Sequence, residues 1–193
     1  MSALKCALIT CLLWLTASGA SPAANPIIVS DVFGHRVAPL GAGKRKATVL
    51  IYITNDCPIA NACAPEIERI VRTYEPEKIG FCLVYVDSSL TAAAARKHRQ
   101  DYGYTCAAVL DPDHKLVAAG KAEVTPEAAV FAPDGKLVYH GRIDDRAVAF
   151  GQVRSVPTRK DLCETLNAYL QGKSVPNSYV KAVGCNIADL GRK

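Results

Sequence analysis

The 193-residue sequence predicts an α/β protein with a central mixed β-sheet flanked by helices. Residues 48–54 and 81–86 form nearly continuous apolar, β-branched runs, which are typical of strands covered on both faces. A stretch with helical spacing lies between the two runs, and this strand–helix–strand order makes the strands parallel. Residues 128–132 and 137–143 are joined by a Pro-Asp-Gly-Lys turn, which predicts an antiparallel hairpin.

The first half of the chain supplies the parallel part of the sheet. A short strand is expected within residues 26–34, ahead of the first long strand. Residues 64–74 carry apolar side chains at helical spacing with charges between them, so they predict the crossover helix. Residues 90–102 are rich in alanine and charged side chains, which predicts a second helix capped by Ser88 or Ser89.

The second half begins with a short predicted strand at residues 107–110, followed by one or two helical turns at 114–119. After the hairpin, residues 158–170 place three leucines four residues apart, which predicts a helix. We expect Thr158 to cap the start of this last helix and Gly172 to end it.

Residues 1–24 have the three parts of a secretory signal peptide. Lys5 supplies the charged start, residues 6–15 form a short apolar core, and small residues fill 17–24. The apolar run is shorter than the roughly 20 residues that span a membrane, although an uncleaved N-terminal anchor is the alternative. We therefore expect export to the periplasm or the extracellular space, with residues 25–193 folding as one domain.

Composition narrows the classes of partner and cofactor. The formal net charge is +5, and the densest basic run is residues 44–46. No cluster of basic residues is combined with a stripe of aromatic residues, so no nucleic-acid partner is expected. An oxidising compartment permits disulfides, and no pair of cysteines has zinc-ribbon spacing, so we expect neither a metal nor another cofactor. Outside the signal segment the cysteines are Cys57, Cys63, Cys82, Cys106, Cys163 and Cys185.

Cys57 is the cysteine whose position predicts reactivity. It precedes Pro58 between a predicted buried strand and a predicted helix, and Pro58 suits a first helical position. Unpaired N–H groups and the dipole at a helix N-terminus favour a thiolate, whereas the neighbouring Asp56 opposes it. We expect a modest reduction of the Cys57 pKa; the alternative is an inert or disulfide-bonded structural cysteine.

Residues 54–66, which include Cys57-Pro58 and Pro65-Glu66, resemble the active-site segment of the thioredoxin-like redoxin superfamily. The resemblance is to its exported TlpA/ResA-type and alkyl hydroperoxide reductase/thiol-specific antioxidant members. Thr125-Pro126 is similar to their cis-proline loop, which packs beside the reactive sulfur. The resemblance implies a thioredoxin-like fold over residues 48–170, a cis peptide bond before Pro126, and catalytic roles for Cys57, Thr125 and Pro126.

The sequence departs from this pattern where the second cysteine of a Cys-x-x-Cys motif would stand. Ala60 occupies that position, so the usual local disulfide cannot form. Cys63 is one possible resolving thiol, but on a straight helix it lies nearly opposite Cys57. Cys185, in the C-terminal tail, is the other.

Thiol–disulfide oxidoreductase chemistry is the leading functional hypothesis, with a protein disulfide as substrate and an unknown thiol as electron donor. A thiol peroxidase acting on peroxide is the first alternative, because Thr54 and Cys57 match the Thr-x-x-Cys part of a peroxiredoxin site. In that case Thr54 and an arginine bind peroxide, and Arg142 is the candidate. Leu50 stands where the peroxiredoxin motif has proline.

A non-catalytic binding module is the second alternative, and the loss of the second motif cysteine to Ala60 favours it. One form is a metallochaperone that binds copper through Cys57, Cys63 and His140. The spacing of the two cysteines differs from that of copper-delivering relatives, so no metal site is expected.

Overall fold

A computed structural model describes residues 26–41 and 43–188 of the chain. The predicted signal peptide at 1–24 lies outside the described residues, as does the end of the tail at 189–193. Among the helices that the structure describes, none is long and apolar enough to cross a membrane.

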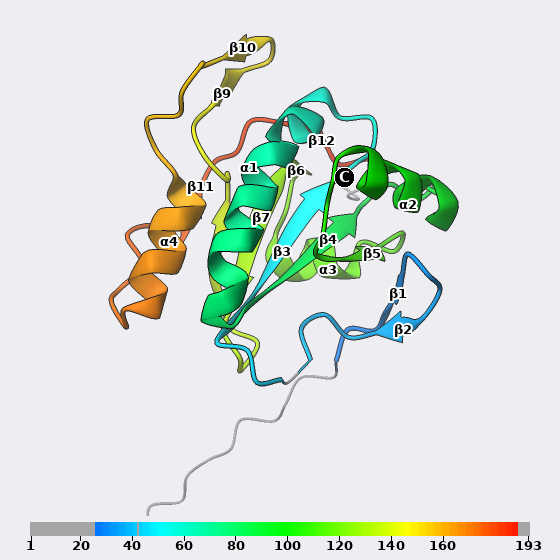
Figure 1. The fold of residues 1–193 in the computed structure, drawn as a ribbon, viewed down its shortest axis with the longest axis horizontal. Helices are drawn as coiled ribbons and strands as arrows, with labels where there is room; N and C mark the ends of the chain where they lie inside the picture. Colours follow the sequence, from blue (N-terminus) through cyan, green and yellow to red (C-terminus); the bar gives the residue numbers. More distant parts are fainter. Residues whose placement is uncertain (1–25, 42, 189–193) are drawn as a thin grey trace, which may run out of the picture.

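The predicted elements occur in the expected order, with further short strands among them (Figure 1). They are β1 (Val29–Asp31), β2 (Arg36–Val37), β3 (Ala47–Ile53), α1 (Pro58–Tyr74), a 3₁₀ turn (Glu75–Glu77), β4 (Ile79–Tyr85), α2 (Ala92–Asp101), β5 (Ala107–Leu110), α3 (Lys115–Gly120), β6 (Val124–Thr125), β7 (Glu127–Phe131), β8 (Leu137–Gly141), β9 (Ala147–Ala149), β10 (Gln152–Val153), α4 (Asp161–Leu170), β11 (Tyr179–Val180) and β12 (Cys185–Asn186).

The main sheet is mixed, as predicted, with the strand order β11-β8-β7-β3-β4-β5-β1-β2. The central strand β3 runs parallel to β4 and antiparallel to β7. The predicted hairpin is the antiparallel pair β7–β8. Because β3 and β4 have a strand on both sides and a covering layer on both faces, every residue in each of them is buried.

Alternation along β3 divides the core into two layers. Val49, Ile51 and Ile53 pack in the cluster that includes residues of α1, α2 and α4, whereas Leu50 and Tyr52 pack in the cluster that includes α3. In Figure 1, α1 and α4 cross in front of the sheet and α3 lies behind it. Burying each large apolar side chain stabilises the fold by about 1.5–3 kcal/mol, so these two layers hold β3 firmly in place.

The predicted caps of two helices are wrong. Helix α2 begins after Thr91, whose hydroxyl oxygen accepts a hydrogen bond from the Ala94 N–H at 3.2 Å. Ser88 and Ser89 lie too early in the chain, and Ser89 instead hydrogen-bonds the carboxylate of Asp87.

Helix α4 begins after Lys160 rather than at Thr158. The hydroxyl of Thr158 donates to the carboxylate of Asp145, so this threonine ties a preceding loop together instead of capping the helix.

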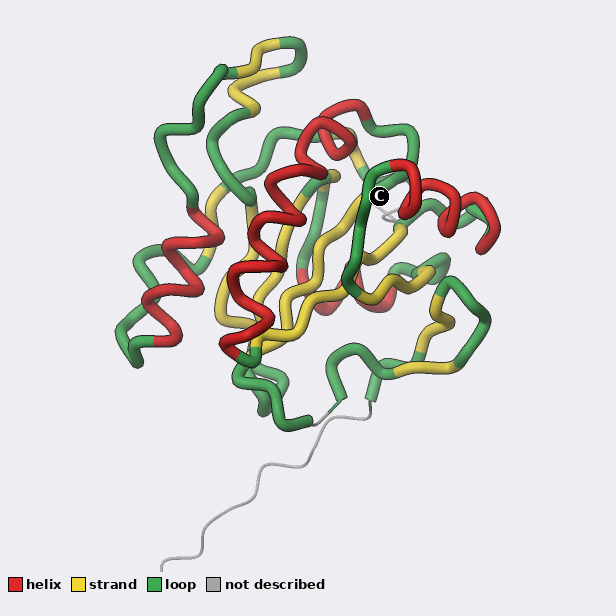
Figure 2. The backbone as a smooth tube through the Cα atoms, viewed as in Figure 1, coloured by secondary structure: helices red, strands yellow, loops and turns green. Residues whose placement is uncertain are grey.

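Two of the features that the sequence-based prediction did not include bear on the site. One is the β9–β10 arm, a two-stranded ribbon that stands away from the rest of the chain (Figure 2). The other is β12, which pairs antiparallel with β6 in a separate two-stranded sheet at the end of the molecule where α1 begins (Figure 1).

Candidate functional site

Cys57 occupies the junction of β3 and α1, as its sequence position predicts. It is the N-cap of α1, and its sulfur accepts a hydrogen bond from the Ala60 N–H at 3.4 Å. Pro58 begins the helix, so α1 starts six residues before the predicted stretch at 64. Pro65 lies within the continuous helix and does not interrupt it. The Cys57 sulfur therefore lies where the helix dipole favours an anion.

The loop containing Pro126 lies beside this sulfur. The Thr125–Pro126 peptide bond is cis, which confirms the prediction for this bond. In its thiol form Cys57 donates a hydrogen bond to the carbonyl oxygen of Thr125 at 3.1 Å. The structure thus brings three of the predicted site residues together.

Cys185 joins them from the far end of the chain. Cys185 is the residue opposite Thr125 in the antiparallel β6–β12 pair. The two thiols lie close enough for each to shift the pKa of the other, so the two sulfurs are neighbours. Gly184 permits this approach, because a Cβ atom at that position would lie 2.2 Å from the Thr125 carbonyl oxygen.

The two thiols have opposite pKa shifts. Burial raises the pKa of Cys57, but hydrogen bonds from the Cys185 thiol and the Ala60 N–H outweigh burial and leave this pKa lowered. Burial, the Cys57 sulfur and the charge of Asp56 raise the pKa of Cys185 to about 12. At neutral pH, Cys57 is therefore the better nucleophile and Cys185 stays protonated as its hydrogen-bond donor.

Cys63 lies elsewhere on α1. Its thiol lines a groove beside the helix, and burial together with the charge of Asp144 raises its pKa to about 12. Among the described residues, the thiol that shifts the pKa of Cys57 is that of Cys185 and not that of Cys63. All six described cysteines are free thiols in the structure.

Thr54 and Arg142 are the residues that the peroxidase alternative assigns to peroxide binding. Within residues 26–41 and 43–188, no hydrogen bond joins Thr54 to Cys57. Arg142 is engaged with Asp161, and its Nε lies 2.6 Å from a carboxylate oxygen. Within the described residues, neither Thr54 nor Arg142 hydrogen-bonds the Cys57 sulfur, although Arg142 lines the groove beside it.

His140 is directed toward different partners from those of a copper site. Its Nδ1 lies 3.8 Å from a carboxylate oxygen of Glu127, and its ring stacks on Tyr179 with centroids 4.6 Å apart. In the part of the chain that the structure describes, no group of three or more His, Cys, Asp or Glu residues is placed to hold a metal ion.

An apolar groove of about 340 Å³ adjoins the Cys57 site, and sequence patterns gave no indication of it. It lies between the start of α1 and the β9–β10 arm and reaches the cis-proline loop. Its lining residues are Pro58, Ile59, Ala62, Cys63, Pro126, Arg142, Ile143, Asp144, Arg146, Ala147, Phe150, Gly151, Val153 and Val183.

Solved structures share this fold. The chain is similar to an uncharacterized conserved protein from Geobacillus kaustophilus, with 24% identity, a TM-score of 0.70, and coverage of 85% of this chain and 88% of that one. A hypothetical protein from Sinorhizobium meliloti gives 23% identity, a TM-score of 0.70, and coverage of 86% and 91%. A secreted disulfide oxidoreductase from Mycobacterium tuberculosis, homologous to DsbE of E. coli, gives 16% identity, a TM-score of 0.53, and coverage of 76% and 96%.

No protein-family model and no curated protein matches the sequence. The structural likenesses and the mixed sheet with flanking helices show that the chain has the thioredoxin-like fold. A fold of this kind accommodates different activities, so the function has to be argued from the site.

Proposed function

We propose that this chain is an exported thiol–disulfide oxidoreductase in which Cys57 is the nucleophile and Cys185 is the resolving thiol. The observation that carries the proposal is the contact between these two thiols across the Thr125 carbonyl. Export is supported by the signal-like residues 1–24 and by the secreted oxidoreductase among the structural neighbours.

The reaction starts from the reduced pair. The Cys57 thiolate attacks one sulfur of a substrate disulfide; a new sulfur–sulfur bond forms, the substrate bond breaks, and the first substrate thiolate leaves. Cys185, after loss of its proton, then attacks the sulfur of Cys57. This forms the Cys57–Cys185 disulfide and releases the second substrate thiolate. The substrate gains two electrons and the protein loses two, which a thiol donor returns.

The pKa pattern supports this order of events. The charge of the Cys57 thiolate is one cause of the raised Cys185 pKa. A mixed disulfide at Cys57 carries no such charge, so its formation lowers the pKa of Cys185 when a second nucleophile is needed. Cys185 therefore stays protonated before the first attack and becomes more reactive after it.

The reaction also requires that a substrate disulfide can reach the Cys57 sulfur. Cys57 is only 1% exposed, and the β12 tail lies against it. The tail must move aside to admit a substrate disulfide and return to resolve the intermediate. This tail, held to β6 by a short pair of strands, is well suited to such a motion because few hydrogen bonds hold it.

Trapping the intermediate tests the proposal. Reduced wild-type protein, Cys185→Ser and Cys63→Ser are each mixed with a disulfide-linked peptide, and the products are mapped by mass spectrometry. Cys185→Ser should accumulate a mixed disulfide on Cys57, whereas Cys63→Ser should still form the Cys57–Cys185 bond. Accumulation on Cys63→Ser instead would assign resolution to Cys63, and turnover by Cys57→Ser would refute the proposal.

The peroxidase alternative is tested in parallel. Rapid hydrogen peroxide consumption without turnover of the peptide disulfide would favour a thiol peroxidase. The absence of both activities would favour a binding module.

A further inference from the structure

We infer that the groove between α1 and the β9–β10 arm binds an extended apolar segment of the polypeptide whose disulfide reacts at Cys57. This inference rests on the proposed function and concerns its substrate class. The groove is continuous with the reactive centre, because Pro58 and Pro126, the residues next to Cys57 and Thr125, line its near end.

The arm supplies the outer wall of the groove. Phe150 and Val153 both line it, yet Phe150 is 71% exposed and Val153 is 63% exposed. Neither side chain contributes to the core of the domain at that exposure. Large apolar side chains gathered at the surface mark a site that another molecule covers.

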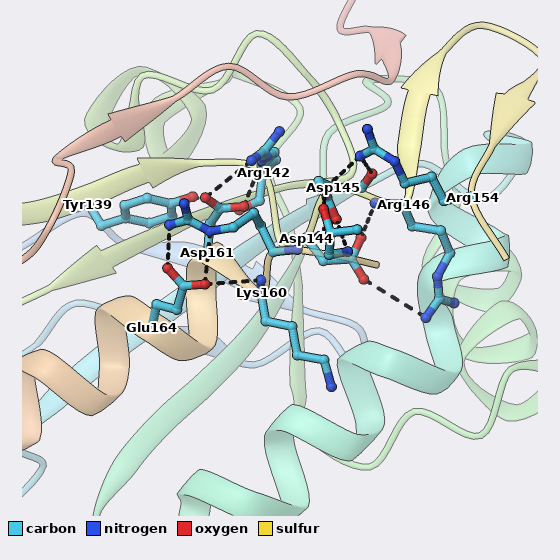
Figure 3. Close-up of polar contacts among 11 residues, drawn as sticks. Tyr139, Arg142, Asp144, Asp145, Arg146, Arg154, Lys160, Asp161 and Glu164 are labelled. Carbon is cyan, nitrogen blue, oxygen red and sulfur yellow. Dashed lines mark hydrogen bonds and ion pairs between the residues drawn. The ribbon is translucent and has the colours of Figure 1, made fainter. Parts of the chain in front are cut away.

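The base of the arm is fixed by polar contacts, which Figure 3 shows. The Asp145 carboxylate accepts hydrogen bonds from the Thr158 N–H at 2.7 Å and the Arg159 N–H at 2.9 Å, and Arg154 donates to the same carboxylate. The two ends of the arm are thereby held together at Asp145. The apolar tip is presented on a fixed stem, which limits the entropy that the arm loses when a ligand binds.

The Asp144 carboxylate on the groove lining can recognise the backbone of a bound segment. Asp144 lines the groove and is 8% exposed; one of its carboxylate oxygens accepts from the Arg146 N–H at 2.9 Å. Its other oxygen, Oδ2, is buried and lies 3.9 Å from the Arg146 guanidinium, without a hydrogen-bond donor among the described residues. Because a buried acceptor without a donor is costly, this oxygen is suited to receive an N–H from a bound segment.

The tail of the chain indicates which kind of molecule fits. Val183 lines the groove while Cys185, two residues later, lies against Cys57. A substrate polypeptide that takes the place of this tail, with its own cysteine at Cys57, therefore directs the side chain two residues earlier into the groove. An apolar residue at that position suits the lining.

Two peptide disulfides that differ at one position test this. One contains Leu-Gly-Cys and the other Ser-Gly-Cys, and kcat/KM is measured with wild-type protein and with Phe150→Ser/Val153→Ser. Wild type should prefer the leucine peptide roughly tenfold, and the double variant should lose this preference. Val156→Ser is the matched control, because Val156 is 70% exposed but does not line the groove.

Reduction of hydroxyethyl disulfide, which is too small to reach the arm, separates binding from chemistry. The double variant should reduce it at the wild-type rate. An equal loss toward the small disulfide, or an unchanged preference for leucine, would overturn the inference. So would a wild-type dimer that Phe150→Ser/Val153→Ser dissociates, since the groove would then be covered by a second copy. Turnover by Cys57→Ser, in contrast, would refute the proposed function itself.

Discussion

Cys185 lies opposite Thr125 in the β6–β12 pair, and the Thr125 carbonyl oxygen accepts the hydrogen bond of the Cys57 thiol. One residue of the cis-proline loop therefore positions both thiols. In the proposed function, Cys185 of the tail acts in place of the second motif cysteine that is absent at Ala60. This arrangement separates the two thiols in the sequence and makes their contact depend on the β6–β12 pairing.

Gly184→Ala should separate the two thiols without removing either. A Cβ at this position would lie 2.2 Å from the backbone oxygen of Thr125, so the tail must shift away. We expect the mixed disulfide at Cys57 to resolve at least roughly tenfold more slowly, and stability to fall by about 1–3 kcal/mol from overpacking. Quenched-flow trapping and thermal unfolding measure the two effects.

Gly43→Ala is the matched control for Gly184→Ala. The nearest atom to a Cβ at Gly43 lies 4.0 Å away, which is an ordinary contact distance. This variant should resolve the intermediate at the wild-type rate. If Gly184→Ala also resolves it at that rate, β12 does not hold Cys185 in place for the reaction.

The pH dependence of Cys57 alkylation should depend on Cys185. In wild type the pKa of Cys57 is lowered, with the Cys185 thiol as the leading hydrogen bond that opposes burial. In Cys185→Ala the contribution of the Cys185 thiol is lost while the surrounding core still buries Cys57, so the pKa of Cys57 rises and less thiolate is present at a given pH. The midpoint of the iodoacetamide rate against pH should shift upward.

The midpoint, rather than the absolute rate, is the measurement, because the rate also depends on the nucleophilicity of the thiolate. Cys63→Ser should leave the midpoint where it is, since Cys63 is absent from the causes of the Cys57 pKa shift. An unchanged midpoint in Cys185→Ala would contradict the coupling of the two thiols.

Much of the fold follows from local patterns, and parts of the site do not. The runs around Leu50 and Leu83 predict buried strands because each carries enough apolar residues to form two core layers. Cys57 is predictable as a helix N-cap because strand, cysteine and proline are adjacent in the sequence. These inferences require only short-range information.

The partner of Cys57 is set by long-range contacts. Strand β12 has two residues, Cys185 and Asn186, and a two-residue strand has no periodicity to recognise. The sequence analysis therefore left Cys63 and Cys185 as alternatives. The β9–β10 arm was also not predictable from the sequence, because Phe150 and Val153 are exposed and do not follow the pattern of a buried strand or helix. The groove between α1 and the arm joins residues that are far apart in the sequence, so no local pattern predicts it.

Asp145→Asn should loosen the arm. Hydrogen bonds from the Thr158 hydroxyl and the N–H groups of Thr158 and Arg159 lower the pKa of Asp145 to about 2. The variant keeps an oxygen acceptor but loses the charge, so we expect faster amide exchange across residues 146–158. Asp113→Asn, which alters an exposed pair with Lys115, should not change that exchange.

The same clamp should respond to acid in the wild-type protein. Because the folded-state pKa of Asp145 is lowered, its contribution is present above the ordinary carboxyl pKa of about 3.9 and is lost as pH falls through about 2. Amide exchange in the arm, corrected for its intrinsic pH dependence, should rise over that interval. Protection that persists below pH 2 would mean that other contacts hold the arm.

Thr91→Ala should destabilise the protein by about 1 kcal/mol, because the Thr91 hydroxyl caps α2 through the Ala94 N–H. Ser88→Ala is the matched control, since the sequence pattern favoured a serine cap that the structure does not use. Chemical denaturation of both variants measures the difference in the free energy of unfolding. If Ser88→Ala costs as much as Thr91→Ala, then α2 begins earlier in solution and the cap predicted from the sequence was right.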